Sequence, residues 1–217
     1  VPSKKHFFFS HTFKKQVHNR KLLQAFLEKK ITMIDYELLT DENGTRLTAF
    51  GRYAGVVGAF KALRGWGLMH ELYDLKPAHK CRDRAEMDGE LDQVELEKPI
   101  KIVVTGTGRV AHGAREVLDR AGVHWVSPAA FLSQTFTESV YTDLSPLEYN
   151  HKIDGTTARA QEFYRHPDRF ESSFSRYSSV ADIYIACHYW DNKAPHIIKV
   201  EDYLAPDFKI KMIADIS

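Results

Sequence analysis

The segment 99–122 constrains the fold more than any other part of this 217-residue chain. Its first residues, 100–104, form an apolar run that is typical of a buried parallel strand. The sequence Gly-Thr-Gly-Arg-Val-Ala follows at 106–111 in the form G-x-G-x-x-A and leads into a helix expected over 109–121. A strand, a glycine turn and a helix in this order predict a dinucleotide-binding unit of Rossmann type.

Each position of this turn has a physical role. Gly106 permits the tight turn, and Gly108 lets a pyrophosphate approach the backbone. Arg109 and Val110 begin the helix, where unpaired N–H groups and the positive end of the helix dipole attract phosphates. Ala111 is small enough for the helix to pack closely on the strand. We therefore predict that these residues bind a dinucleotide; a glycine turn with a purely structural role is the alternative.

The choice between NAD and NADP depends on the end of the second strand, which we expect at 123–126. NAD sites offer a carboxylate there, which binds the ribose hydroxyls and repels a 2′-phosphate. This chain has Ser127 and no acid at that point, and Arg109 is placed to attract a phosphate. We expect Ser127 to contact the cofactor and NADP to be favoured over NAD. The alternative is that Ser127 and backbone groups hold NAD less tightly.

Composition excludes several classes of partner and site. The formal net charge of +1 gives no sign of a nucleic-acid or membrane surface, and no apolar run reaches the ~20 residues of a membrane span. Cys81 and Cys187 lack metal-ligand spacing, so we expect free thiols and no metal. The expected location is the cytoplasm, with the mitochondrial matrix as the alternative in a eukaryote.

The hydrophobic pattern predicts an α/β protein with two domains. Residues 1–50 read as the C-terminal part of an α/β catalytic domain, with strands at 5–10 and 31–34, a helix at 19–30 and a hairpin-like return at 46–50. Residues 51–98 read as a connecting helix, rich in small residues, and a linker. Because a buried parallel strand needs neighbours, the strand that opens the chain leads us to expect an upstream segment, and a downstream one as well.

Residues 99–217 are predicted to form the dinucleotide-binding domain, a doubly wound parallel sheet with further strands at 181–186 and 210–216. The stretch at about 133–179 is too long for an ordinary connection and is rich in aromatic residues. We interpret it as an insertion that folds onto the sheet or onto a partner subunit, which leaves a homo-oligomer open.

Candidate reactive side chains lie at the ends of predicted strands. His11 follows the first strand, and histidine suits proton transfer because it titrates near neutrality. The fork of Arg46 suits a carboxylate, although a surface ion pair is the alternative. Asp215 ends an apolar strand at the sheet edge where ligands of such folds bind, and Cys187, His188 and Tyr189 end the preceding strand. We predict that Cys187, His188 and Tyr189 line the cofactor site.

Several stretches resemble a known family. Phe9–Lys14 with Gln16, then 35–37, 41–46 and 49–55, resemble saccharopine dehydrogenase of the lysine-forming type. The stretches 105–108, 164–170, 189–190 and 214–217 are still more similar to the lysine-ketoglutarate reductase domain of bifunctional aminoadipate semialdehyde synthases. Both groups fall within the alanine dehydrogenase and transhydrogenase superfamily.

The resemblance implies a two-domain enzyme with its active site in the cleft between the domains. Such an enzyme interconverts saccharopine with L-lysine and 2-oxoglutarate, using a nicotinamide cofactor. His11 matches the family's acid/base histidine; Gln16, Glu37 and Arg46 match polar groups of the substrate site, and Asp215 matches an aspartate beside the nicotinamide. The family's catalytic lysine falls upstream of the first residue here.

The resemblance therefore implies small-molecule partners, an amino acid and a 2-oxo acid, and leads us to regard the chain as a fragment that binds a dinucleotide without turnover. Two alternatives remain open. An amino-acid dehydrogenase of the alanine dehydrogenase type would use ammonia as the amine. A non-catalytic regulatory domain would bind the nucleotide alone.

Overall fold

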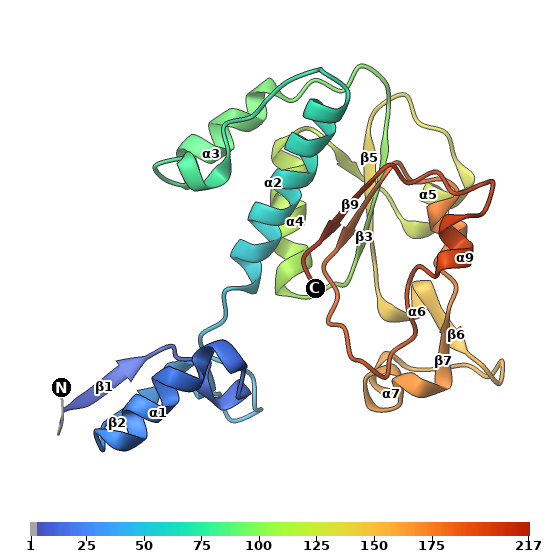
Figure 1. The fold of residues 1–217 in the computed structure, drawn as a ribbon. Coiled ribbons are helices and arrows are strands. Elements are labelled where there is room, and N and C mark those ends of the chain that lie inside the picture. The colour runs from blue at the N-terminus through green and yellow to red at the C-terminus, as the bar shows by residue number, and fades with distance from the viewer. Residues whose placement is uncertain (1–3) are drawn as a thin grey trace. The chain divides into compact units, whose positions relative to one another are not determined.

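The computed structural model describes residues 4–217, which form two compact units (Figure 1). The N-terminal unit extends to Phe50, and the C-terminal unit runs from Gly51 to Ser217. Both units combine helices with parallel strands, which confirms the α/β class. No helix in the described part of the chain is long and apolar enough to cross a membrane.

The N-terminal unit is built on one strand-helix-strand crossover. Strands β1 (Lys5–Phe8) and β2 (Thr32–Asp35) pair in parallel, and helix α1 (Arg20–Glu28) connects them. Parallel neighbours need such a crossover, because a tight turn can join only antiparallel strands. Three short 3-10 turns complete the unit: η1 (Thr12–Lys14), η2 (Val17–Asn19) and η3 (Tyr36–Leu38).

The hairpin-like return predicted at 46–50 is present only as a short turn, and the residues 46–50 do not form a strand. Antiparallel pairing is limited to one bridge between Thr40 and Arg46. The Asp41 side chain accepts hydrogen bonds from the backbone N–H groups of Asn43 and Thr45, at 2.9 and 2.8 Å. Backbone hydrogen bonds flank the bridge, from Asp41 N–H to Thr45 and from Leu47 N–H to Leu39, both at 2.9 Å, and the Asp41 side chain closes the turn between them.

The C-terminal unit contains a five-stranded parallel sheet in the order β4-β5-β3-β8-β9. Its strands are β3 (Lys101–Thr105), β4 (His124–Trp125), β5 (Val140–Leu144), β8 (Ile183–Ala186) and β9 (Met212–Asp215). The chain starts at the central strand β3, fills one side of the sheet with β4 and β5, and then fills the other side. This change of direction is the hallmark of a doubly wound sheet and confirms the predicted fold.

Helices cover both faces of this sheet. On one face lie α2 (Gly51–Met69) and α4 (Arg109–Arg120), which Figure 1 shows side by side. The other face packs against a core that includes Phe131, Tyr149 and Tyr177. These residues belong to the short helices α5 (Pro128–Ser133), α6 (Pro146–Tyr149) and α8 (Ser175–Ser178).

The remaining elements are short and peripheral to the sheet. Strands β6 (Asn150–Lys152) and β7 (Phe170–Ser172) form an antiparallel pair. The helices are α3 (Arg84–Glu90), α7 (Ala160–Arg165) and α9 (Val200–Tyr203), and the 3-10 turns are η4 (Ala78–Lys80), η5 (Leu91–Gln93) and η6 (Pro167–Arg169).

Two predicted boundaries need correction. The supposed insertion at 133–179 contains β5, which pairs with β3 over all five of its residues. Residues 140–144 are therefore part of the central sheet. The polar residues Thr142 and Asp143 interrupt the apolar run, so the sequence pattern did not predict this strand. The predicted connecting helix, α2, is more than a connection: Ala59, Phe60 and Leu63 are fully buried in the core of the C-terminal unit.

Helices α2 and α4 approach closely because each has a glycine at the crossing. A Cβ on Gly55 would lie 1.8 Å from the carbonyl oxygen of Val110, and one on Gly113 would lie 1.9 Å from that of Arg52. Neither backbone atom can move away without separating the helices. At the same crossing, Arg52 binds Glu116 through two hydrogen bonds of 2.5 and 2.8 Å.

We expect Gly113→Ala to lower the free energy of unfolding by about 2 kcal/mol or more, because overpacking outweighs the ~1 kcal/mol gain in helix propensity. Gly89→Ala in α3 is the matched control, since a Cβ there meets nothing within 4 Å. It should be neutral or slightly stabilising. Urea midpoints measure both effects, and a Gly113→Ala protein as stable as the wild type would show that the crossing tolerates a methyl group.

Candidate functional site

The glycine turn after β3 is fixed between two neighbouring strands. Gly106 has φ +96°, and a Cβ there would lie 2.7 Å from the carbonyl oxygen of Cys187. Its N–H donates to the carbonyl of Leu144 at 2.8 Å. Both the backbone angle and the lack of space therefore require glycine at this position.

The second glycine of the turn faces open space. Gly108 is the N-cap of α4, and a Cβ at this residue would meet nothing within 4 Å. The neighbouring residues Thr107 and Arg109 are exposed and Val110 is half-buried. The amino end of a twelve-residue helix thus opens onto room that a side chain would fill. These residues fit the pyrophosphate of a dinucleotide, which needs backbone N–H groups and close approach.

The strand order does not support the reason for expecting Ser127 at the ribose, because β4 is an edge strand and β5 is the neighbour of β3. Ser127 caps α5, and its hydroxyl accepts a hydrogen bond from the N–H of Ala130 at 3.2 Å. The strand next to β3 carries Asp143, one residue before its end and in register with Val104. The carboxylate expected of a NAD site is therefore present, on a strand that lies later in the sequence than expected.

Asp143 is held by two neighbours. One carboxylate oxygen lies 3.1 Å from the guanidinium of Arg115 on α4, and the other accepts a hydrogen bond from the Trp125 indole at 2.6 Å. The residues 124–133, which form β4 and α5, separate α4 from β5. This extra segment lengthens the usual spacing of about 20 residues between the glycine turn and the acid. Sequence spacing alone therefore pointed to Ser127.

On the other side of β3, the end of β8 carries a chain of hydrogen bonds. The hydroxyl of Thr105 lies 3.0 Å from that of Tyr184 and 2.8 Å from Nδ1 of His188. Burial lowers the pKa of His188 below its usual value, and the nearby Asp215 carboxylate offsets this only in part. Burial raises the pKa of the Cys187 thiol to about 12, so this thiol stays protonated and is a poor nucleophile.

A cavity of about 450 Å³ opens at the ends of β8 and β9. Its polar lining includes His188, Asp215 and Ser217, and its apolar lining includes Ala186 and Ile213. Asp215 accepts hydrogen bonds from the Ser217 hydroxyl and N–H, at 2.7 and 3.0 Å. The structure thus brings two predicted residues, His188 and Asp215, into one cavity.

The other two residues predicted at this edge do not line that cavity. Cys187 is buried, and its N–H donates to the Thr105 carbonyl at 3.0 Å. The Tyr189 side chain is 77% exposed. Their roles in cofactor binding stay predictions.

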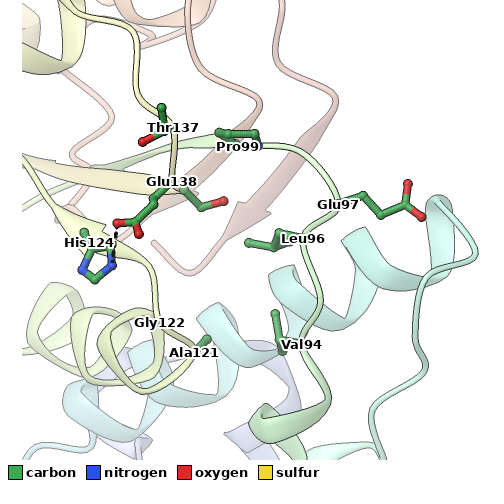
Figure 2. A pocket seen from close by; sticks show the side chains of 10 residues that line it. Val94, Leu96, Glu97, Pro99, Ala121, Gly122, His124, Thr137 and Glu138 are labelled. Atoms are coloured by element: carbon green, nitrogen blue, oxygen red, sulfur yellow. Dashed lines mark ion pairs between the residues drawn. The ribbon is translucent and has the colours of Figure 1, made fainter.

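A second cavity, of about 350 Å³, lies at the amino ends of β3, β4 and β5 (Figure 2). It is lined by residues that precede β3 and β5 and by Gly122 and His124 at the start of β4. His124 and Glu138 face each other there, with Nε2 and Oε2 3.2 Å apart. Because ligands of parallel α/β sheets bind at the carboxyl ends of the strands, this cavity at the amino ends does not fit the dinucleotide.

In the N-terminal unit, a cluster of basic side chains surrounds the Glu37 carboxylate. Glu37 is fully buried, and its oxygens lie 2.8 Å from Nδ1 of His11, 3.0 Å from the Arg46 guanidinium and 3.5 Å from the Lys14 ammonium. A buried carboxylate is costly unless cations or donors compensate it, so these contacts account for the charge at this position. The structure thus brings together three predicted residues, His11, Glu37 and Arg46.

Local hydrogen bonds hold this cluster. The Ser10 hydroxyl donates to Asp35 at 2.5 Å, and the N–H of Glu37 donates to the same carboxylate at 3.0 Å. Burial alone would raise the pKa of Asp35, but these hydrogen bonds outweigh it and lower that pKa. The ends of β1 and β2 are thereby tied together. His11 has φ 55°, an uncommon angle for a residue other than glycine, and such angles often mark functional positions.

Gln16 lies apart from these contacts. It is exposed at the N-cap of η2 and lines a cavity of about 300 Å³ with Thr12, Lys15 and Arg20. Sequence reasoning did not select Lys14, although its place three residues after His11, on the same short turn, was the available signal.

The cluster around Glu37 combines two chemical capabilities. The Glu37 carboxylate lies 2.8 Å from Nδ1 of His11 as a close charge contact that is not aligned as a hydrogen bond, and Nε2 is the nitrogen left to exchange a proton with a ligand. The side chains of Lys14 and Arg46 are 39% and 48% exposed, so each cation also has a surface that a carboxylate ligand can reach.

The chain is similar to known proteins of the family that the sequence motifs resemble. The chain is 31% identical to the mitochondrial alpha-aminoadipic semialdehyde synthase of Rattus norvegicus over 93% of its own length. It is 27% identical to the saccharopine dehydrogenase [NAD(+), L-lysine-forming] of Neurospora crassa over 98% of its length. The predicted resemblance is confirmed. No family model matches the chain.

The matches cover only part of each relative. The chain spans about a quarter of the rat protein and about half of the fungal one, at 24% and 50%. Among solved structures, an L-alanine dehydrogenase matches 99% of this chain and 50% of its own, with a TM-score of 0.54 and 14% identity. This structural match shows a shared fold.

Proposed function

We propose that the protein is an oxidoreductase that interconverts saccharopine with L-lysine and 2-oxoglutarate, using NAD. The observation that carries this proposal is the buried Glu37 with His11 at 2.8 Å and Arg46 at 3.0 Å. This cluster brings together a proton-transfer group, His11, and a carboxylate-binding group, Arg46. The open glycine turn before α4 supports dinucleotide binding, and the named relatives support the substrate class.

The roles follow from the chemistry of joining an amine to a 2-oxo acid. Nicotinamide supplies or accepts the hydride. His11 gives and takes protons as the carbinolamine loses water to form the imine, and Glu37 keeps its ring oriented. Arg46 and Lys14 bind substrate carboxylates, which both saccharopine and 2-oxoglutarate carry. Asp215 acts beside the nicotinamide, and Gln16 contacts the substrate from the neighbouring cavity.

Amine specificity tests this proposal. The full-length protein should oxidise NADH in the presence of 2-oxoglutarate and lysine, and much more slowly when ammonia replaces lysine. A preference for ammonia with a short 2-oxo acid would instead indicate an alanine dehydrogenase-type enzyme. Binding of NADH with no turnover on any amine and oxo-acid pair would indicate a regulatory nucleotide-binding domain.

Cofactor preference should follow Asp143 and not Ser127. We expect Asp143→Ser to shift the ratio of kcat/KM for NADH over NADPH by ~10-fold towards NADPH, equivalent to ~1.4 kcal/mol. The substitution removes a carboxylate that repels a 2′-phosphate and releases Arg115, 3.1 Å away, to attract one. Ser127→Asp is the contrasting variant and should leave the ratio unchanged. The reverse pattern would show that the ribose lies beside β4.

A further inference from the structure

The arrangement of the sheet defines a path for a dinucleotide. Asp143 lies on β5, on one side of the central strand β3, whereas the cavity with His188 lies at the ends of β8 and β9, on the other side. Gly108 stands between them, after β3. A ligand with its pyrophosphate at Gly108 and one ribose at Asp143 therefore extends its other half towards the cavity.

The hydrogen-bond chain beside this cavity specifies where the protons lie. Tyr184 is almost fully buried, and burial raises the pKa of its hydroxyl, which therefore keeps its proton. Among the described residues, Thr105 is the hydrogen-bond partner of that hydroxyl, at 3.0 Å. A buried hydroxyl hydrogen needs an acceptor, so Tyr184 donates to Thr105.

The same hydrogen-bond argument determines the tautomer of His188. Thr105 is fully buried and accepts from Tyr184, so its own hydrogen points to Nδ1 of His188, 2.8 Å away. Nδ1 is then the acceptor nitrogen, and a neutral imidazole must carry its proton on Nε2. The opposite arrangement, with the proton on Nδ1, would leave one hydroxyl hydrogen, that of Tyr184 or that of Thr105, without an acceptor among the described residues.

We propose that His188 is a cofactor-positioning residue, whose Nε2–H donates a hydrogen bond to the carboxamide oxygen of the nicotinamide and so fixes the rotation of the ring. The proposal rests on the proposed function, because it takes the ligand to be a nicotinamide dinucleotide. Ala186 and Ile213 give the cavity apolar walls for a flat ring. Its polar lining includes His188 and Asp215 and also Tyr184, His196 and Ser217. A neutral imidazole also avoids repelling the positive charge of the oxidised ring.

The tautomer is tested first without any ligand, by nitrogen NMR of the full-length protein labelled with ¹⁵N-histidine. His188→Gln identifies the resonances. We expect Nδ1 of His188 to resonate as an unprotonated nitrogen and Nε2 as a protonated one, and Thr105→Val to remove this preference. A protonated Nδ1 in the wild type would overturn the proposal.

Ligand binding then separates this proposal from the proposed function. We expect His188→Leu to weaken NAD⁺ binding ~3–10-fold, the range for one neutral hydrogen bond, while ADP-ribose, which lacks the nicotinamide, binds unchanged. His188→Gln keeps a donor near the Nε2 position and should retain most of the affinity. His124→Leu, in the cavity of Figure 2, is the matched control and should change neither ligand.

The outcomes are distinct. If the wild type binds NAD⁺ and His188→Leu binds both ligands as the wild type does, the positioning role is wrong and the proposed function stands. If the wild type binds neither NAD⁺ nor ADP-ribose, the proposed function is wrong, and this inference with it. Equal losses for both ligands in His188→Leu would show a structural effect on the site and would also overturn the positioning role.

Discussion

Replacing His11 with alanine in the full-length protein should lower kcat by ~10²–10⁴, the range for losing one general acid/base. The imidazole lies 2.8 Å from a buried carboxylate and is 41% exposed, so it is both oriented and reachable by a substrate. The proton transfers that form and release the imine would then depend on water. The pH profile of kcat/KM should lose one limb in the variant.

His18→Ala is the matched control for this prediction, because His18 is an exposed histidine of the same unit. Its kcat should equal that of the wild type. If His11→Ala retains full kcat and an unchanged pH profile, His11 has a structural role in holding Glu37, and another group moves the protons.

Gly108→Val should weaken NAD⁺ binding at least ~100-fold, or ~2.8 kcal/mol, while the protein remains folded. A Cβ at this position meets no atom of the described residues within 4 Å, so the substitution creates no clash with them. That space is where the pyrophosphate must approach the first turn of α4, so valine excludes it sterically. Gly106→Val would be a poor test, because φ +96° and the nearby Cys187 carbonyl make it a folding defect.

Gly89→Val is the control for the same substitution away from the glycine turn, since Gly89 is exposed and a Cβ there has no neighbour within 4 Å. Fluorescence titration measures the affinities, and circular dichroism checks the fold of each variant. Unchanged NAD⁺ affinity in Gly108→Val would place the phosphate site elsewhere.

The parts of the fold that depend on neighbouring residues in sequence could be predicted. The glycine turn after β3 was predicted because each requirement there, a tight turn, a close approach and a helix start, acts within a few residues. Helix α4 and strand β8 were predicted for similar reasons, since their apolar patterns are regular. The α/β class and the doubly wound sheet followed from these elements.

The parts that depend on strand order could not be predicted. Strand β5 carries Thr142, which is fully buried, and Asp143, so its pattern does not resemble an apolar strand. Its place beside β3 is decided by packing across the sheet, and with it the position of the acid. The expectation for Ser127 rested on the wrong strand order for this reason.

The candidate site was predicted in part for the same physical reason. His11, Glu37 and Arg46 were selected as separate polar residues, but their meeting at one buried carboxylate depends on tertiary contacts. Burial of Glu37 has no local signal, because its neighbours Tyr36 and Leu38 are both more exposed than it is. Lys14 was missed because Lys14 and Lys15 together have the pattern of a solvated basic surface, and only the folded turn places Lys14 beside Glu37.

Product identification tests the central claim most directly. The full-length protein is incubated with L-lysine, 2-oxoglutarate and NADH, and the product is identified by mass spectrometry. The account predicts a single secondary amine whose mass equals lysine plus 2-oxoglutarate, less one water and plus two hydrogens, which is saccharopine. With deuterated NADH, that product should gain one deuterium at the carbon that carried the keto group. NADH oxidation that yields only the amino acid of the added 2-oxo acid, or no joined product, would contradict the account.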